Sequence, residues 1–153
     1  MKVRLDIDKS LKDDEIVIRS SCIDNVSKIH QKILDITKSA PNIVFYKDNK
    51  EFYLEIKDVL FFESSDNDIY AHTKDNMFLV KYRLYELEET LSKNFVRISK
   101  STIVNINQIF AISSSFGSSY TLEFIKSHKQ VYVSRRYMKI LRYRLEERRN
   151  YEI

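Results

Sequence analysis

Hydrophobic and polar positions alternate at the start of the chain and then follow a helical repeat. Residues 1–8 alternate apolar with charged side chains, which is the two-residue period of a half-buried strand. Ile16–Ile18, after an acidic turn, predicts a second strand. Apolar residues then recur every three or four positions, which predicts an amphipathic helix that ends near Ser39, before Pro41. The apolar positions of this helix are Ile23, Val26, Ile29, Ile33 and Ile36. The first 41 residues are therefore expected to form a small ββα segment.

From Asn42 onward the pattern predicts a series of short strands. The expected strands are Ile43–Tyr46, Glu51–Ile56, Val59–Ser65, Ile69–Thr73, Met77–Lys81, Phe95–Ile98, Thr102–Asn105, Ile109–Ile112, Tyr120–Phe124 and Gln130–Val133. Asparagine and aspartate must supply the left-handed turn positions, as at Asp48-Asn49, because the chain contains one glycine. Leucines at helical spacing predict a short helix over Leu84–Leu91, and Ser134 is the expected N-cap of a final amphipathic helix. Parallel crossovers are absent, so the predicted fold is mainly β, with small antiparallel sheets and short helices.

The composition is that of a globular protein with an uneven distribution of charge. Hydrophobic residues make up 43% and charged residues 31% of the 153 positions, and no stretch approaches the roughly 20 apolar residues of a membrane span. The net charge is only +4, but nine cations and three carboxylates lie from Lys126 onward. This basic end fits a polyanionic partner, although a solvated helix face rich in arginine explains the charge equally well.

Cysteine and glycine usage narrows the classes of function. The one cysteine, Cys22, excludes an internal disulfide and a structural zinc site, and we expect it to be a small buried apolar residue in a reducing compartment. The start of the chain lacks the apolar block of a secretory signal, which favours a cytoplasmic protein. A single glycine, Gly117, excludes the glycine-rich loops with which nucleotide-dependent enzymes hold phosphates. No cofactor is expected.

Three carboxylates on one predicted strand and its following turn form the best enzyme-like feature: Glu63, Asp66 and Asp68. Such a group could hold Mg²⁺ for a metal-dependent nuclease, which is the alternative function. An acidic turn between two strands explains the same residues more simply, so no metal is expected. The serines lack a nucleophile-elbow pattern. The histidines lack a repeated ligand spacing, and we expect surface or capping roles for them: His30, His72 and His128.

Two basic segments carry the chemistry that DNA phosphates accept. Arg97–Thr102 joins two predicted strands and brings an arginine, a lysine and three hydroxyl groups together. Tyr132–Tyr137 leaves a strand and enters a helix, whose N-terminus favours a phosphate while an arginine reaches a groove. Either segment alone is compatible with an ordinary polar turn, whereas the two together favour DNA.

Four segments occur in an order and at a spacing typical of one family. They are Val59–Ser65, Leu84–Leu91, Phe95–Asn105 and Val133–Tyr137. Together they resemble the LytTR DNA-binding domain of bacterial regulators. The central Phe-x-Arg-x-x-x-Ser-x-x-Val-Asn run is the most specific part. The resemblance covers Ile43 to Glu147, about two thirds of the chain.

The resemblance implies an elongated stack of small sheets that inserts loops, rather than a helix, into successive major grooves of double-stranded DNA. The loops would be a first around Ser65–Asp68, a second at Ser99–Ser101 and a third at Arg135–Arg136. The implied base contacts are Lys100, Arg136 and Asn67. The implied phosphate contacts are Ser99, Ser101, Tyr132, Arg135, Tyr137 and Lys139.

Other family positions are expected to serve the fold or to depart from the family pattern. Arg97 and Asn105 belong to the signature, and we favour structural roles for both. Asp66 and Asp68 replace cationic or hydroxyl residues of relatives, and carboxylates repel phosphate, so only Asn67 is expected to read a base in the first loop. The expected core residues are Phe61, Phe62, Phe95, Ile103 and Val104.

The expected domains are a dimerisation or partner module at residues 1–41, a LytTR-type DNA-binding domain at 42–149 and a tail at 150–153. The first module is too short for the receiver domain that typical family members carry. A chain that carries a LytTR-type domain without a receiver domain resembles small one-component regulators. Such regulators are often encoded beside a small membrane protein that controls them. We therefore expect a homodimer on direct-repeat DNA sites, with such a membrane protein as a further partner.

Overall fold

The computed structural model describes residues 10, 15–22, 26–27, 29–30, 33, 41–115 and 119–151. The chain divides into two units, Met1–Ser39 and Ala40–Ile153.

The described part of the first unit confirms helical structure and corrects two expectations. Val26, Ile29 and Ile33 are helical and half-buried, as the amphipathic pattern predicts. The expected first strand and the remaining helix positions lie outside the described residues. The prediction of a strand at Ile16–Ile18 is wrong: these residues join no sheet, and the side chains of Ile16 and Val17 are mostly exposed. Three apolar residues alone do not make a strand, because its backbone groups need a paired neighbour.

Cys22 is exposed, so the expectation of a buried thiol is also wrong. The Ser20 hydroxyl accepts a hydrogen bond from Cys22 N at 3.1 Å and donates one to Cys22 O at 3.0 Å. This polar turn satisfies the backbone of Cys22 locally and leaves its side chain at the surface.

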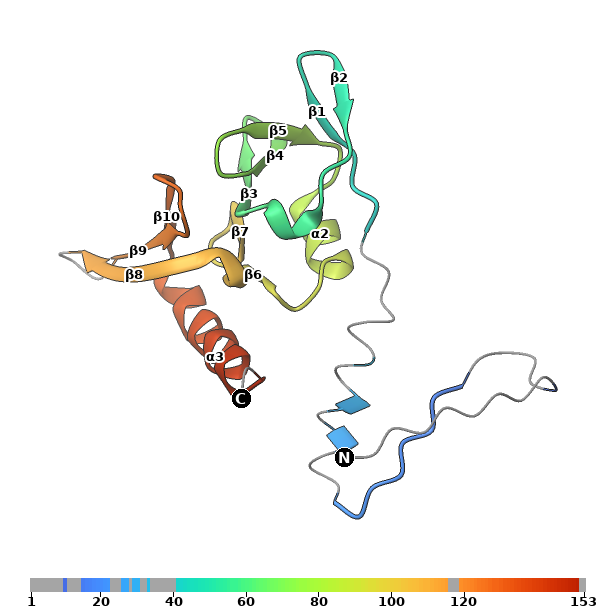
Figure 1. The fold of residues 1–153 in the computed structure, drawn as a ribbon. Coiled ribbons are helices and arrows are strands. Elements are labelled where there is room, and N and C mark those ends of the chain that lie inside the picture. The colour runs from blue at the N-terminus through green and yellow to red at the C-terminus, as the bar shows by residue number, and fades with distance from the viewer. Residues whose placement is uncertain are drawn as a thin grey trace. The chain divides into compact units, whose positions relative to one another are not determined.

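The described part of the second unit contains two antiparallel sheets and two helices (Figure 1). The larger sheet has the order β2-β1-β5-β4-β3-β7-β6 and the smaller the order β10-β9-β8. The strands of the larger sheet are β1 (Phe45–Lys47), β2 (Lys50–Phe52), β3 (Phe61–Ser65), β4 (Asp68–His72), β5 (Met77–Val80), β6 (Phe95–Arg97) and β7 (Thr102–Asn105). The smaller sheet consists of β8 (Ile109–Ser115), β9 (Ser119–Phe124) and β10 (Gln130–Val133). The helices are α2 (Leu84–Thr90) and α3 (Arg135–Tyr151), with 3₁₀ turns at Ile56–Asp58 and Ile106–Gln108. This arrangement confirms the predicted mainly-β, antiparallel fold with short helices.

Several element boundaries differ from the prediction. The expected strand Glu51–Ile56 ends at Phe52, because β2 is an edge strand with a single neighbour and the chain then turns into the 3₁₀ segment. The final helix, for which the sequence predicted only the start, ends at Tyr151, and its last turns contain glutamates and arginines that favour helix.

The tight hairpins confirm the role expected of asparagine and aspartate. Asp48 and Asn49 connect β1 to β2 with φ of 51° and 59°, and Asp66 and Asn67 connect β3 to β4 with φ of 50° and 68°. Two left-handed residues in succession form the hairpin turn whose twist matches the paired strands. Lys126 also has a positive φ, of 52°, which its residue type does not indicate.

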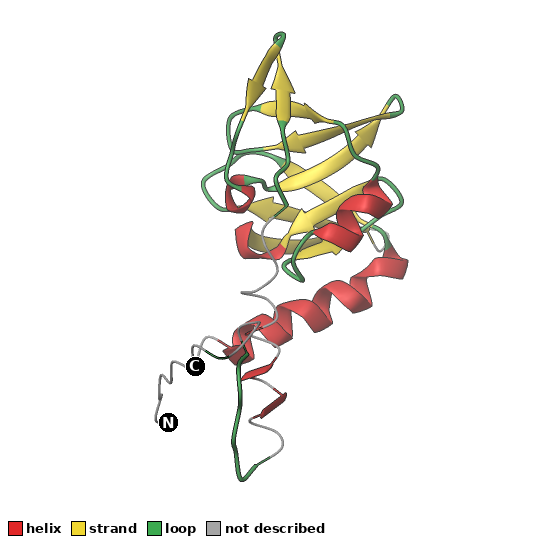
Figure 2. Cartoon of the chain, turned by 90° about the vertical axis from the view of Figure 1, so that its right-hand side faces the viewer, coloured by secondary structure: helices red, strands yellow, loops and turns green. Residues whose placement is uncertain are grey.

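Both faces of β3 and β7 are buried, which explains their continuous apolar runs. Neighbouring strand residues point to opposite faces, so Phe62 and Ile103 join one core with α2, whereas Phe61 and Val104 join a second core with β9, β10 and α3. All four are buried as expected, and Phe95 is half-buried against the first core. Figure 2 shows α3 running below the strands.

Asn105 has the structural role expected of it. Its side chain is buried, donates hydrogen bonds from Nδ2 to Val59 O at 3.0 Å and Lys57 O at 3.4 Å, and accepts one from Asn107 N at 3.1 Å. It thereby ties the end of β7 to the segment that leads into β3.

His72 ends β4, and the expectation of a surface or capping role for it is wrong. The imidazole stacks on Phe61 with ring centres 4.2 Å apart, and only 12% of its side chain is exposed. Its Nε2 has no hydrogen-bond partner among the described residues and lies 3.5 Å from the half-exposed Glu63 carboxylate. Burial, and less strongly the charge of Lys129, lower the pKa of His72 to about 4. The imidazole is therefore neutral at pH 7 and packs as an aromatic ring.

This pKa predicts a loss of stability in acid. The unfolded chain, with a histidine pKa near 6.5, binds a proton that the folded protein excludes, so folding weakens as pH falls from 6.5 towards 4. We expect His72 to lower the free energy of unfolding by roughly 2 kcal/mol between pH 7 and pH 5. Urea denaturation should show that His72→Gln removes most of this decline. His128→Gln, in an exposed turn, should keep it, and an equal decline in both variants would contradict the assignment.

Candidate nucleic-acid interface

Three connections lie side by side at one end of the larger sheet, and we call them the loop row. They are the first loop (Ser65–Asp68), the second loop (Ser99–Ser101) and the third loop (Arg135–Arg136). Ser64 N donates to Ser101 O at 2.8 Å, which joins the first loop to the second. Ser134 N, directly before the third loop, donates to Ile98 O, directly before the second loop, at 2.9 Å, which ties the starts of these two loops together. The structure thus brings together the three segments that the sequence analysis selected.

The second loop is folded around the guanidinium of Arg97. Arg97 Nε donates to Ser99 O at 2.7 Å, Nη2 donates to Lys100 O, and Nη1 pairs with Glu88 of α2 at 2.7 Å. The Ser99 hydroxyl also accepts from Ser101 N at 3.1 Å. Arg97 therefore has the structural role that was favoured for it, and the turn leaves the side chain of Lys100 exposed.

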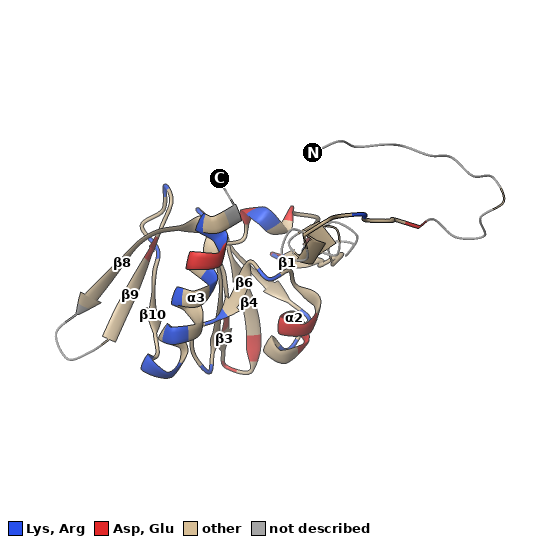
Figure 3. Ribbon diagram, turned by 90° about the horizontal axis from the view of Figure 1, so that it is seen from below, with Lys and Arg blue, Asp and Glu red and all other residues tan. Residues whose placement is uncertain are grey.

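The third loop is the first turn of α3, which begins directly after Ser134 as expected. Arg135 and Arg136 are exposed, as is Lys139 one turn further along, whereas Tyr137 is half-buried. Cations at a helix N-terminus are unfavourable for the helix itself, because the backbone dipole is already positive there. The same arrangement attracts an anion such as phosphate. In Figure 3 lysines and arginines colour much of α3, whereas acidic residues colour α2.

Tyr132 lies on the exposed face of β10, shortly before the third loop. Its neighbours Val131 and Val133 point into the second core, so strand alternation places the Tyr132 ring outward, and 70% of the residue is exposed. Its phenol is thus available to a partner that approaches the third loop.

The first loop is acidic and exposed at Asp66, Asn67 and Asp68. Arg83, just before α2, donates from Nη1 to Asn67 O at 3.3 Å. Arg83 was not among the site residues predicted from the sequence. A signal was available, since arginine stands where helix starts favour serine, threonine, aspartate or asparagine.

The nuclease alternative gains no support from the structure. Asp66 lies in the turn and Asp68 begins β4, whereas the Glu63 carboxylate faces His72 on the sheet. Among residues 41–115 and 119–151 and the few described before them, no group of three histidine, cysteine, aspartate or glutamate side chains is arranged to hold a metal ion.

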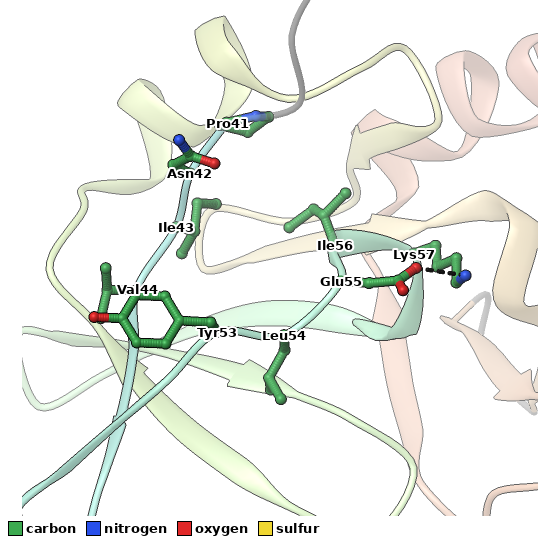
Figure 4. Close-up of a pocket in the computed structure, with 9 residues that line it drawn as sticks. All are labelled: Pro41, Asn42, Ile43, Val44, Tyr53, Leu54, Glu55, Ile56 and Lys57. Atoms are coloured by element: carbon green, nitrogen blue, oxygen red, sulfur yellow. Dashed lines mark ion pairs between the residues drawn. The ribbon is translucent and has the colours of Figure 1, made fainter.

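A mainly apolar hollow elsewhere in the second unit is separate from the loop row. It is lined by Pro41–Val44 and Tyr53–Lys57 (Figure 4). Its cation, Lys57, pairs with Glu55 at 2.5 Å and so offers little to a phosphate. Neither α2, α3 nor any other helix in the described part of the chain is long and apolar enough to cross a membrane.

Comparison with known proteins assigns this antiparallel fold, with its row of exposed loops, to a class of DNA-binding domains. Residues 49–146 match the family model of the LytTr DNA-binding domain. A solved LytTr DNA-binding domain, of a protein described as a methyl-accepting/DNA response regulator from Bacillus cereus, superposes with a TM-score of 0.63 at 27% identity. That likeness covers 69% of this chain and 97% of the solved one.

Two relatives are uncharacterised HTH-type transcriptional regulators of Staphylococcus aureus. The one from strain NCTC 8325 / PS 47 is 35% identical over 122 residues, and the one from strain bovine RF122 / ET3-1 is 35% identical over 125 residues. Each match covers 80% of this chain and 82% of the relative. The chain belongs to the LytTR family and is a DNA-binding transcriptional regulator. In its described part, α2 and α3 are separated by β6 to β10, so these two helices do not form a helix-turn-helix.

The anchoring of the second loop predicts the effect of Arg97→Lys. Lysine keeps the charge but lacks the planar fork that reaches Ser99, Lys100 and Glu88 together. We expect DNA affinity to fall by about 1 kcal/mol, a factor of roughly five, without a change in salt dependence. Fluorescence anisotropy on a duplex selected from genomic DNA measures both quantities. Arg144→Lys, in the Arg144–Glu147 pair of α3, is the control, and equal affinity of the two variants would contradict the anchoring role.

Proposed function

We propose that this chain regulates transcription by inserting the three loops of the loop row into the major groove of specific double-stranded DNA sites. One observation carries the proposal. Backbone hydrogen bonds hold the three loops side by side, with the exposed cations Lys100 and Arg136 on neighbouring loops. Loops fixed in this way present their side chains to DNA with little ordering on binding.

Lys100, Arg136 and Asn67 are the proposed base contacts, one from each loop. Arginine and lysine match the acceptors on the major-groove edge of guanine, and asparagine matches adenine. All three residues are exposed. The bond between Arg83 and Asn67 uses the carbonyl of Asn67, which leaves its side-chain amide for a base.

The proposed phosphate contacts surround these residues and position the protein on the duplex. They are Ser99, Ser101, Tyr132, Arg135, Tyr137 and Lys139. The two serines lie on either side of Lys100, and the others come from the end of β10 and the first turns of α3. Hydroxyl, phenol and cationic groups of this kind supply most contacts to the sugar–phosphate backbone.

We further propose that residues 1–41 form a dimerisation or partner module, so that two chains bind a direct-repeat site in the cytoplasm. The half-buried apolar side chains of Val26, Ile29 and Ile33 along one helical face support it. A small membrane protein encoded nearby is the proposed regulatory partner.

Substitution of the two exposed cations tests the DNA-binding role. Arg136→Ala should weaken specific binding by about 1–3 kcal/mol and flatten the base preference at one position of the site. Lys100→Ala should weaken binding and reduce the slope of log affinity against log salt. Competition binding on single-base variants of the selected duplex measures the first effect, and a salt titration measures the second.

A gel-shift titration of the selected duplex with the protein, in EDTA, distinguishes a DNA-binding protein from the nuclease alternative. Intact, shifted duplex in EDTA supports a binding protein, whereas cleavage that requires Mg²⁺ would favour the nuclease. Unchanged affinity in both Arg136→Ala and Lys100→Ala would exclude the loop row as the DNA face.

The dimer is tested by light scattering of the full chain at tens of micromolar. We expect the wild-type protein to have twice the molar mass of one chain. Ile29→Glu should lower the molar mass to that of one chain, because a carboxylate is costly in an apolar interface. Ser27→Glu introduces the same charge at an exposed helical position and should remain dimeric. A monomeric wild-type chain would contradict the proposed dimer.

A further inference from the structure

The connection between β5 and α2 lies beside the first loop. We call Lys81–Tyr85 the β5–α2 corner. In the larger sheet β5 is the neighbour of β4, and Val80 at the end of β5 pairs with Ile69 at the start of β4, directly after the first loop. The corner is therefore at the same end of the sheet as the loop row. It continues the row on the side of the first loop that faces away from the second loop.

The charges along this extended row are not uniform. The third and second loops carry cations, the first loop carries Asp66 and Asp68, and the corner carries Lys81 and Arg83, which are both exposed. A duplex presents phosphates along its whole length, so two carboxylates within the row oppose its approach. The cations of the corner lie next to these carboxylates and offset them.

The position of Arg83 is unusual for a residue that only begins a helix. Arginine has no acceptor with which to cap the first N–H groups of α2. The helix start is instead supported by Glu86, whose carboxylate accepts from Arg83 N at 2.6 Å. The guanidinium reaches in another direction and donates to Asn67 O at 3.3 Å, so it serves the first loop rather than α2.

Arg83 retains hydrogen-bonding capacity for a ligand. A guanidinium has five N–H donors, and the bond to Asn67 occupies one of them. Two neighbours extend the surface around it. Lys81 Nζ lies 4.2 Å from the ring centre of Tyr46, which holds the ammonium in place, and Tyr85 is 62% exposed. Two cations and an exposed phenol beside one loop match the donors that contact phosphates.

We propose that the β5–α2 corner is a fourth DNA-contacting segment, which binds the phosphate backbone beyond the groove entered by the first loop. Arg83 is its central residue: it contacts a phosphate and positions Asn67 through the carbonyl bond. This inference rests on the proposed DNA-binding function and extends its footprint by one segment. The acidic first loop is thereby flanked by cations on both sides.

The test compares Arg83→Ala with Lys74→Ala in the full chain. Lys74 is an exposed cation in the turn after β4, at the opposite end of that strand from the first loop, so both variants lose one charge. On a selected duplex with long flanks, Arg83→Ala should bind roughly fivefold to tenfold more weakly, and its log–log salt slope should decrease by about one. Lys74→Ala should match the wild type.

A shortened duplex tests the location of the contact. The end of the duplex that lies next to the first loop is identified by trimming each end in turn, and that end is then removed. Wild type and Arg83→Ala should then bind with the same salt slope, because the phosphate has been removed. Arg83→Lys keeps the charge but not the fork, so it should restore the slope and still relax the preference for the base read by Asn67. Thermal unfolding of each variant confirms that it is folded.

Two results would overturn the inference: Arg83→Ala binds like Lys74→Ala, or it binds more weakly with an unchanged salt slope. The second result would assign Arg83 to the support of the first loop alone. If Lys100→Ala and Arg136→Ala weaken binding while Arg83→Ala does not, this inference fails and the proposed function stands. If none of the three variants affects binding, the proposed function itself fails.

Discussion

Burial of both faces of β3 and β7 is the constraint on which the rest of the structure depends. Because adjacent residues such as Phe61 and Phe62 enter different cores, a shift of β3 by one residue would exchange the two sets of side chains. The register is therefore strongly specified, and so are the positions at which the strands end. Asn105 adds a buried polar contact that ties β7 to the segment before β3. The first loop follows β3 and the second precedes β7, so both take their geometry from this central pair.

The cations of a basic surface repel one another, so the loops that carry them need stabilising contacts. In this protein some cations bind acceptors of the protein itself, and others are exposed. Arg97 pairs with Glu88 and binds two carbonyls of the second loop, while Arg148 of α3 donates to Ile106 O at 2.5 Å. Lys100 and Arg136, by contrast, are exposed. Charge content alone does not separate these roles; the separation follows from which side chains the fold brings to acceptors of its own.

The alternation of apolar and polar residues and the asparagine–aspartate turns were sufficient to predict the antiparallel fold and most strand positions, because both are local properties of the sequence. The family signature likewise indicated the three loops. The errors concern properties that depend on the partners of a residue. His72 is half-buried because its register places it on Phe61, and β2 ends early because it is an edge strand. The bond from Arg83 to Asn67 joins residues 16 positions apart that meet only through the pairing of β4 and β5.

The bonds that shape the second loop and hold the first loop use the main chain of Lys100 and Asn67, and their side chains take no part in them. The framework that sets the loop geometry is therefore separate from the side chains that face outward. On the proposed function, substitution at position 100 or 136 changes what the surface recognises at little cost to folding, whereas Asn67 also occupies a left-handed turn position with φ of 68°. After gene duplication, copies of such a regulator can diverge in the sites they recognise through single substitutions, while the sheets, the cores and Arg97 stay under an unrelated selection for stability.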